Sequence, residues 1–174
     1  MFNSFQKITT NLWFDNQAQE AANYYTSIFK NSKLGKIIHY GKEGQEIHKM
    51  PEGSVMTVEF EVEGHTFVAL NGGPLFKFNE SVSFIVNCKD QEEIDYYWER
   101  LKEDGDPAAQ QCGWLKDKFG VSWQIVPTML TELVSDPDSE RSQRAFGAMM
   151  KMKKIVIEDL QNAFDGVRSL DKTA

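Results

Sequence analysis

Apolar residues in the first thirty positions follow two different spacings. Residues 8–14 are rich in β-branched and aromatic side chains, which is typical of a strand. Polar residues follow at 15–17, including Asp and Asn, which are common at the start of a helix. Beyond them, apolar residues recur every three or four positions, as on the buried face of a helix; they are Ala18, Ala21, Ala22, Tyr25, Ile28 and Phe29. The pattern predicts a strand followed by an amphipathic helix.

A second segment with the same pattern begins near position 82. The apolar run at 82–88 is followed by residues 90–93, which have the composition of a helix capping box. A helical stripe comes next, formed by Ile94, Tyr97, Trp98 and Leu101. Trp98 lies 73 residues after Tyr25, and Leu101 lies 73 residues after Ile28. Because strand, cap and stripe share one offset, we interpret the two segments as an internal duplication.

Each predicted helix is followed by further strand-like segments with turns between them. Strands are expected at 34–40, 54–61 and 65–70 in the first half, and at about 109–115 and 121–126 in the second. Glu63 and Gly64 supply a hairpin turn in the first half, and residues 117–120 supply a turn in the second. Each half therefore has the order β-α-β-β-β, and the pattern predicts a fold of the α+β class.

The chain beyond Pro127 differs from both halves because it contains no strand-like run of comparable length. Its apolar spacing instead predicts short helices around residues 145–150 and 160–164. We expect paired modules at 5–127, the first at about 5–75 and the second at about 80–127, and a C-terminal helical extension at 128–174. Four methionines between positions 129 and 152 suit an adaptable packing surface, either in the chain's own core or against a second subunit.

The composition narrows the class of protein. Of the 174 residues, 41% are hydrophobic and 26% are charged, with a net charge of −7, which argues against disorder. The acidic balance also argues against nucleic acid and anionic membranes as partners, because both attract basic surfaces. With no apolar run of membrane-spanning length and no signal-peptide core, a cytoplasmic protein is expected. The two cysteines, Cys88 and Cys112, form neither a disulfide framework nor a metal-binding pair.

Several stretches of the chain are similar to one protein family. The most specific is CGWLKDKFGVSWQIVP at 112–127, and others are LWFD at 12–15, FVALNGGP at 67–74, EIDYYW at 93–98 and MKKI at 152–155. Through them, residues 5–164 resemble the PhnB-like family, also named 3-demethylubiquinone-9 3-methyltransferase-like. That family is part of the vicinal oxygen chelate superfamily, with glyoxalase I, the bleomycin-resistance proteins and extradiol dioxygenases. The resemblance implies two modules that form a half-open mixed barrel, and a homodimer with modules paired within one chain or exchanged between two.

The resemblance also implies where a metal ion would bind. In metal-dependent members of the superfamily, two histidines and one or two carboxylates project from strands into the cavity, because divalent ions need such donors. The corresponding positions are Thr10 and Ser83 in the first strands, and Val68 and Gln124 in the last strands. None of these four side chains is a good ligand for a divalent ion. We therefore expect no metal ion and no cofactor at these positions.

Other chemistry has weaker support in the sequence. A nonstandard metal site can be drawn from His39 and His48 with a nearby carboxylate, but no HxH or HxxxH pair accompanies them. Methyl transfer, the reaction in the family's name, usually involves a glycine-rich turn that leads into a helix, whereas the glycines at 72–73 precede a proline. We therefore interpret the methyltransferase name as unsupported by the residues of this chain. Asp117 is interpreted as a turn-stabilising residue.

Polar side chains on otherwise apolar strands are the candidates for a small-molecule pocket. We predict that the pocket is lined by Thr10, Asn71, Ser83 and Gln124, with Trp13, Cys112 and Trp114. The alternative is that the buried polar groups hydrogen-bond only to one another. Cys112 has no histidine near it in the sequence to activate the thiol, so a structural role is the simpler interpretation of that residue.

Three functions remain open at this point. The first, which we favour, is a metal-free protein that binds a small molecule, and its aromatic walls and acidic charge suit an aromatic or cationic ligand. The second is a lyase, isomerase or dioxygenase that acts on a vicinal oxygenated substrate, through a nonstandard metal site or by acid–base catalysis. The third is a structural homodimer without a ligand. The sequence names neither the ligand nor the reaction.

Overall fold

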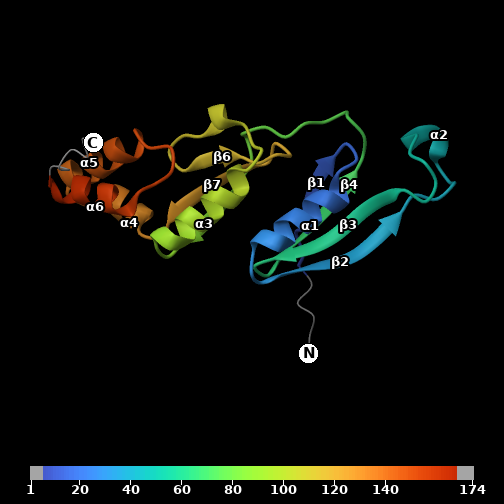
Figure 1. Cartoon of the computed structure of the whole chain (residues 1–174), viewed down its shortest axis with the longest axis horizontal. Helices are drawn as coiled ribbons and strands as arrows, with labels where there is room; N and C mark the ends of the chain where they lie inside the picture. The colour runs from blue at the N-terminus through green and yellow to red at the C-terminus, as the bar shows by residue number, and fades with distance from the viewer. Residues whose placement is uncertain (1–5, 168–174) are drawn as a thin grey trace. The chain divides into compact units, whose positions relative to one another are not determined.

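The strands lie in two separate sheets, one in each half of the chain (Figure 1). The computed structural model describes residues 6–167, and the chain divides into a first unit, Met1–Phe78, and a second unit, Asn79–Ala174. The first unit contains β1 (Thr10–Phe14), α1 (Ala18–Ile28), β2 (Ser32–His39), α2 (Gln45–His48), β3 (Val55–Val62) and β4 (His65–Asn71). The second contains β5 (Ser83–Cys88), α3 (Gln91–Lys102), the short 3-10 helix η1 (Pro107–Ala109), β6 (Trp114–Lys116), β7 (Ser122–Pro127), α4 (Leu130–Val134), α5 (Ser139–Met149) and α6 (Ile157–Asp165).

In the first unit, α1 covers one face of a four-stranded sheet with the strand order β1-β4-β3-β2. β1 is parallel to β4, and the other neighbouring strands are antiparallel. Leu12, Ala69 and Val58 lie side by side across three strands, and each is at most 6% exposed. Tyr25 of α1 stacks on Phe60 of the same face, with 5.9 Å between the ring centroids. The helix-facing side of this sheet is therefore the core of the unit.

The second unit repeats this plan with a smaller sheet. Its strand order is β5-β7-β6, with β5 parallel to β7 and β6 antiparallel to it. The expected strand at 109–115 is wrong, because η1 occupies its start and β6 begins only at Trp114. Cys112 and Gly113 both have left-handed backbone, with φ of 53° and 83°, which interrupts an extended strand. The α+β class and the repeated modules are confirmed, as two open mixed sheets.

The two modules match helix for helix, but their first strands do not match face for face. The buried residues Ala21, Tyr25 and Ile28 of α1 correspond to Ile94, Trp98 and Leu101 of α3, all at the expected offset of 73 residues. The same offset fails in the strands. Leu12 of β1 is 6% exposed, whereas the residue 73 positions later, Ile85 of β5, is 56% exposed.

The mismatch comes from the connection between strand and helix. Residues 15–17 join β1 to α1, but only residues 89–90 join β5 to α3. Because side chains alternate along a strand, one residue fewer in the connection reverses which residues face the helix. Thr10 lies beside Phe67 in the row that α1 covers, whereas Ser83 lies on the opposite face of its own sheet from α3. The expected equivalence of Thr10 and Ser83 is therefore wrong.

The start of α3 is a capping box, as its composition predicts. The carboxylate of Asp90 accepts a hydrogen bond from the backbone N–H of Glu93 at 2.9 Å. The carboxylate of Glu93 reaches back and accepts from the backbone N–H of Lys89, also at 2.9 Å. These bonds satisfy N–H groups that the helix itself leaves without partners, so they fix where α3 begins.

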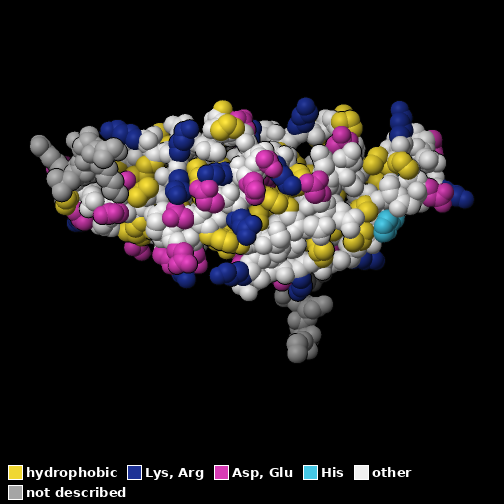
Figure 2. Space-filling view, in the orientation of Figure 1, with side chains coloured by type: hydrophobic (Ala, Val, Ile, Leu, Met, Phe, Trp, Pro, Cys, Tyr) yellow, Lys and Arg dark blue, Asp and Glu magenta, His cyan; other side chains and the backbone are white. Residues whose placement is uncertain are grey.

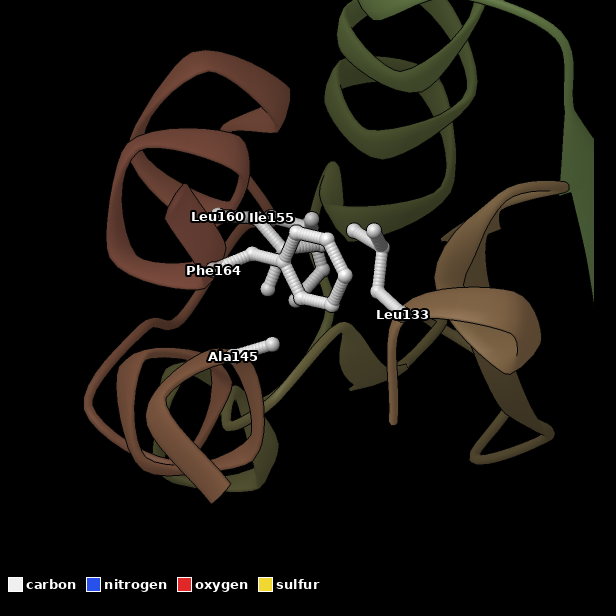
Figure 3. Close-up of a cluster of buried hydrophobic side chains, with 5 residues drawn as sticks. All are labelled: Leu133, Ala145, Ile155, Leu160 and Phe164. Atoms are coloured by element: carbon white, nitrogen blue, oxygen red, sulfur yellow. The ribbon is translucent and has the colours of Figure 1, made fainter. Parts of the chain in front are cut away.

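The three C-terminal helices pack around one apolar cluster. Its members, drawn in Figure 3, are Leu133, Ala145, Ile155, Leu160 and Phe164, and each is at most 7% exposed. Met129, Met149 and Met152 pack against this cluster, whereas Met150 is 44% exposed. Three of the four methionines therefore fill the core of their own unit.

Backbone hydrogen bonds attach this extension to the second sheet. The N–H groups of Cys112 and Gly113 donate to the carbonyls of Met152 and Lys153, each at 2.8 Å. Lys154 adds an ion pair to Asp95 of α3 at 2.6 Å. The extension is thus part of the second unit. Among the helices of residues 6–167, none has both the length and the apolar character needed to cross a membrane.

The two cysteines differ in their surroundings. Cys88 ends β5 and is fully buried, whereas Cys112 is partly exposed. Burial, with smaller contributions from Glu93 and Asp90, raises the pKa of the Cys88 thiol to about 12. Because the pKa is raised, the neutral thiol is the stable form at all lower pH values. Cys88 is therefore a core residue without nucleophilic character at neutral pH.

Removing the side chain of Leu160 tests the C-terminal cluster. We expect Leu160→Ala to lower the free energy of unfolding by about 3 kcal/mol, because it opens a cavity among fully buried neighbours. Chemical denaturation followed by circular dichroism measures the change. Leu75→Ala, at a position that is 73% exposed, is the matched control and should change stability by less than about 0.5 kcal/mol. Equal effects of the two substitutions would contradict the assigned core.

Thiol titration tests the difference between the cysteines. At pH 8, a pKa of about 12 leaves about one Cys88 in ten thousand as thiolate. We expect Ellman's reagent to label one thiol of the native protein, Cys112, and a second only in denaturant. The Cys112→Ser variant should show no reactive thiol until it is unfolded, and rapid labelling of that native variant would show that Cys88 is accessible.

Candidate functional site

Polar side chains gather on the face of the second sheet opposite α3. Side chains alternate along β7, so Trp123 and Ile125, at 5% and 0% exposure, lie on the buried side, and Gln124 lies on the other side. The strand register places Ser83 and Lys116 on either side of Ser122, and Ile85 and Trp114 on either side of Gln124. We name this set the β7 face; its members are Ser83, Ile85, Trp114, Lys116, Ser122 and Gln124.

Two residues predicted from the sequence meet on this face. The side-chain amide of Gln124 donates a hydrogen bond from Nε2 to Oγ of Ser83 at 2.8 Å. Since the Ser83 hydroxyl accepts this bond, its own O–H can donate to another group, and the Gln124 amide oxygen can accept. The pair therefore offers one donor and one acceptor next to each other.

Ser122 adds a polar group that was not among the predicted site residues. It is 2% exposed, and its Oγ has no hydrogen-bond partner among residues 6–167. A buried hydroxyl without a partner costs about 1–3 kcal/mol, so such groups are rare in stable cores. Strand alternation already placed Ser122 on the same face as Gln124, but the sequence does not show that its hydroxyl lacks a partner.

Apolar groups flank the polar pair. Trp114 of β6 is partly buried on one side of Gln124, and its indole N–H makes no hydrogen bond within the described part of the chain. Ile85 of β5 lies on the other side and is 56% exposed. An indole and an aliphatic side chain around a few hydrogen-bonding groups are typical of small-molecule sites.

Thr10 and Trp13 lie in the first unit, on opposite faces of its sheet. Thr10 belongs to the row covered by α1. Trp13 lies on the other face, where its indole N–H donates to the carbonyl of Gly73 at 2.8 Å and its ring meets Phe76 edge-on, with centroids 5.0 Å apart. A Cβ atom on Gly72 would lie only 2.2 Å from this indole. The glycine at 72 is thus required for the packing of Trp13.

Asn71 has a structural position. Its Oδ1 accepts from the backbone N–H of Ala18 at 2.8 Å, and its Nδ2 donates to the carbonyl of Val55 at 3.0 Å. The hydroxyl of Tyr40 donates to its backbone carbonyl at 2.6 Å. Asn71 therefore holds the start of α1 and joins it to β3, which agrees with the alternative that buried polar groups satisfy one another.

Cys112 lies where the C-terminal extension meets the sheet. Its Sγ is 3.7 Å from Sδ of Met150, and its backbone N–H donates to Met152. This position agrees with a structural role for the thiol.

Asp117 organises the turn between β6 and β7, as expected. The carboxylate is 2% exposed and accepts from the backbone N–H groups of Phe119 and Val121 at 2.9 and 3.0 Å. Its second oxygen accepts from the indole N–H of Trp123 at 2.9 Å. These bonds fix the side on which Trp123 leaves β7, and therefore the side on which Gln124 lies.

The histidines do not come together with carboxylates. His39 is exposed on β2, and the ring of His48 packs against Tyr40 with centroids 4.5 Å apart. Nδ1 of His48 accepts from the backbone N–H of Met50 at 3.0 Å. Within residues 6–167, no group of three His, Cys, Asp or Glu side chains has an arrangement that could hold a metal ion.

Charge on the β7 face is local and differs from the net charge of the chain. Acidic and basic side chains are interspersed on the side of the molecule seen in Figure 2. On the β7 face, Lys116 forms an ion pair with Glu80, and the hydrogen bond from Lys116 lowers the pKa of the Glu80 carboxyl. No local pattern in the sequence signals this pair, because its members are separated by most of a module.

Comparison with known proteins places the chain in a family. The family model described as 3-demethylubiquinone-9 3-methyltransferase matches residues 6–126. The match ends within β7, so the extension and its MKKI stretch lie outside the matched region, in contrast to the expected similarity up to residue 164. A search of curated proteins finds no match.

Solved structures give the same assignment. The PhnB protein from Bacillus cereus is 36% identical, with a TM-score of 0.59 over 70% of this chain and 99% of its own. A protein from Pseudomonas aeruginosa is 19% identical, with a TM-score of 0.53 over 70% of this chain and 97% of its own, which shows the fold alone. The fosfomycin resistance protein FosX from Listeria monocytogenes is 15% identical over 76% of this chain and 97% of its own, but its TM-score of 0.47 supports no conclusion. The family match and the Bacillus structure together show that this chain belongs to the PhnB-like, 3-demethylubiquinone-9 3-methyltransferase family.

Proposed function

We propose that this protein binds a small molecule on the β7 face without a resident metal ion. The observation that carries the proposal is the buried, unpartnered hydroxyl of Ser122 beside the hydrogen-bonded pair of Ser83 and Gln124. A ligand that supplies a partner to Ser122 removes the cost of the unsatisfied group. Trp114 and the exposed Ile85 supply the apolar contact that such a ligand needs.

The proposed site is narrower than the set of residues chosen from the sequence. Ser83, Gln124 and Trp114 remain in it, and Ser122 joins them. Thr10 and Asn71 are left out because they belong to the α1 side of the first sheet. Trp13 and Cys112 are left out because each is already held by its own neighbours.

A binding role is favoured over an enzyme with a His39 or His48 metal site. The reason is that these histidines do not meet carboxylates in the described residues. Hydroxyls, an amide and an indole bind and orient a ligand, but they do not supply a strong acid or base at neutral pH. We further propose, from the family resemblance, a cytoplasmic homodimer.

Light scattering on the purified full chain tests the dimer. We expect a mass twice that of one chain at micromolar concentration. Elution as a monomer across the concentration range would contradict this part of the proposal, and it would leave the proposed binding face unaffected.

Nuclear magnetic resonance tests the proposed binding face. We expect benzamide, a small neutral aromatic amide, to shift the indole N–H signal of Trp114 and to leave that of Trp98, which is 3% exposed, unchanged. Gln124→Leu should weaken this binding about tenfold, because it removes one hydrogen bond at the centre of the site.

Gln45→Leu is the matched control, since it makes the same chemical change on the exposed helix α2. It should bind benzamide as the unmodified protein does. Unchanged affinity in Gln124→Leu, or the absence of any shift at Trp114, would refute the site.

A further inference from the structure

Lys116 and Glu80 form an ion pair that spans the second sheet. Lys116 belongs to β6 at one edge, and Glu80 lies three residues before β5 at the other edge. The strand between them is β7, and the register places Lys116, Ser122 and Ser83 in one row on the same face. The ion pair therefore joins the two edges of the β7 face close to Ser122.

The two members of the pair are not equally exposed. The Lys116 side chain is 22% exposed, whereas that of Glu80 is 62% exposed. The ammonium group is thus part of the face, while the carboxylate comes from solvent and from a residue outside the strands. An exposed carboxylate on a partly buried ammonium can be exchanged for another carboxylate at small cost, because exposed ion pairs contribute little to stability.

We propose that Lys116 and Ser122 form an anion subsite on the β7 face, in which the carboxylate of a ligand takes the place of the Glu80 carboxylate. This inference rests on the proposed binding function and names the class of its ligand. The ligand has an advantage over Glu80, because Oγ of Ser122 has no partner although Glu80 is bound to Lys116. A carboxylate that reaches both groups gains a second donor and satisfies the buried hydroxyl.

Trp114 defines the rest of the ligand. It lies two residues before Lys116 on β6, and on the same face, so their Cα atoms are about 7 Å apart. This spacing suits a ring on the indole and a carboxylate directly attached to that ring at the ammonium. The structure thus assigns an aromatic carboxylate to this face, in place of the cationic ligand that the net charge of −7 suggests.

The test compares benzoate with benzamide, which has nearly the same shape and no charge. We expect the full-length protein to bind benzoate more tightly than benzamide, as measured by the shift of the Trp114 indole signal. Lys116→Met should weaken benzoate about tenfold and leave benzamide nearly unchanged. Glu80→Gln should strengthen benzoate about fivefold, because it removes the competing carboxylate, and should not change benzamide.

Two further variants separate the subsite from general effects of charge and folding. Glu61→Gln makes the same change in the Lys33–Glu61 ion pair of the first unit and should leave benzoate affinity unchanged. Ser122→Ala removes a hydroxyl without a partner, so it should fold normally and weaken benzoate only. Its normal folding keeps the test valid if Lys116→Met is unstable.

The outcomes distinguish the subsite from the site. Benzamide binding at Trp114 without tighter binding of benzoate, or a Glu80→Gln variant that affects both probes equally, would overturn the anion subsite and keep the proposed function. Binding of neither probe would overturn both. Tighter binding of benzoate that Ser122→Ala and Lys116→Met both reduce would support the subsite.

Discussion

The packing of one helix on one face of each sheet is the constraint on which the rest of this structure depends. In each unit the helix-facing side holds the apolar core, with Tyr25 on Phe60 in the first unit and Trp123 on the α3 side in the second. Because strand side chains alternate between faces, burying one set commits the other set to the opposite face. What is left for binding is therefore decided by which residues the core needs.

A single residue in a connection changes that assignment. The shorter link between β5 and α3 keeps the helix in phase with its counterpart and moves the strand by one position. As a result Cys88 and Val86 lie on the helix side, and Ser83, Ile85 and Asn87 lie on the other. The same shift separates Ser83 from Thr10, so the two modules present different chemistry on the faces that their helices leave uncovered.

The β7 face that results is suited to recognition. Its groups are two hydroxyls, an amide, an indole and one ammonium, and the ammonium already holds a carboxylate. The buried carboxylate of Asp117 in the adjacent turn has three donors of its own and is occupied in holding Trp123. Polar groups in this unit thus divide into those that are satisfied and shape the fold, and one, in Ser122, that is not.

The sequence by itself determined the helices, most strands, the capping box at Asp90 and the pairing of Ser83 with Gln124 on one sheet. These features follow from periodicity, caps and turns, which are local and therefore visible in the order of residues. The tertiary structure alone decided that Asn71 is satisfied, that Ser122 is not, and that Lys116 meets Glu80. The physical reason is that a hydrogen bond or ion pair between distant segments depends on register and on the length of each connection. One residue more or less there reverses a face without disturbing the pattern of the strand itself.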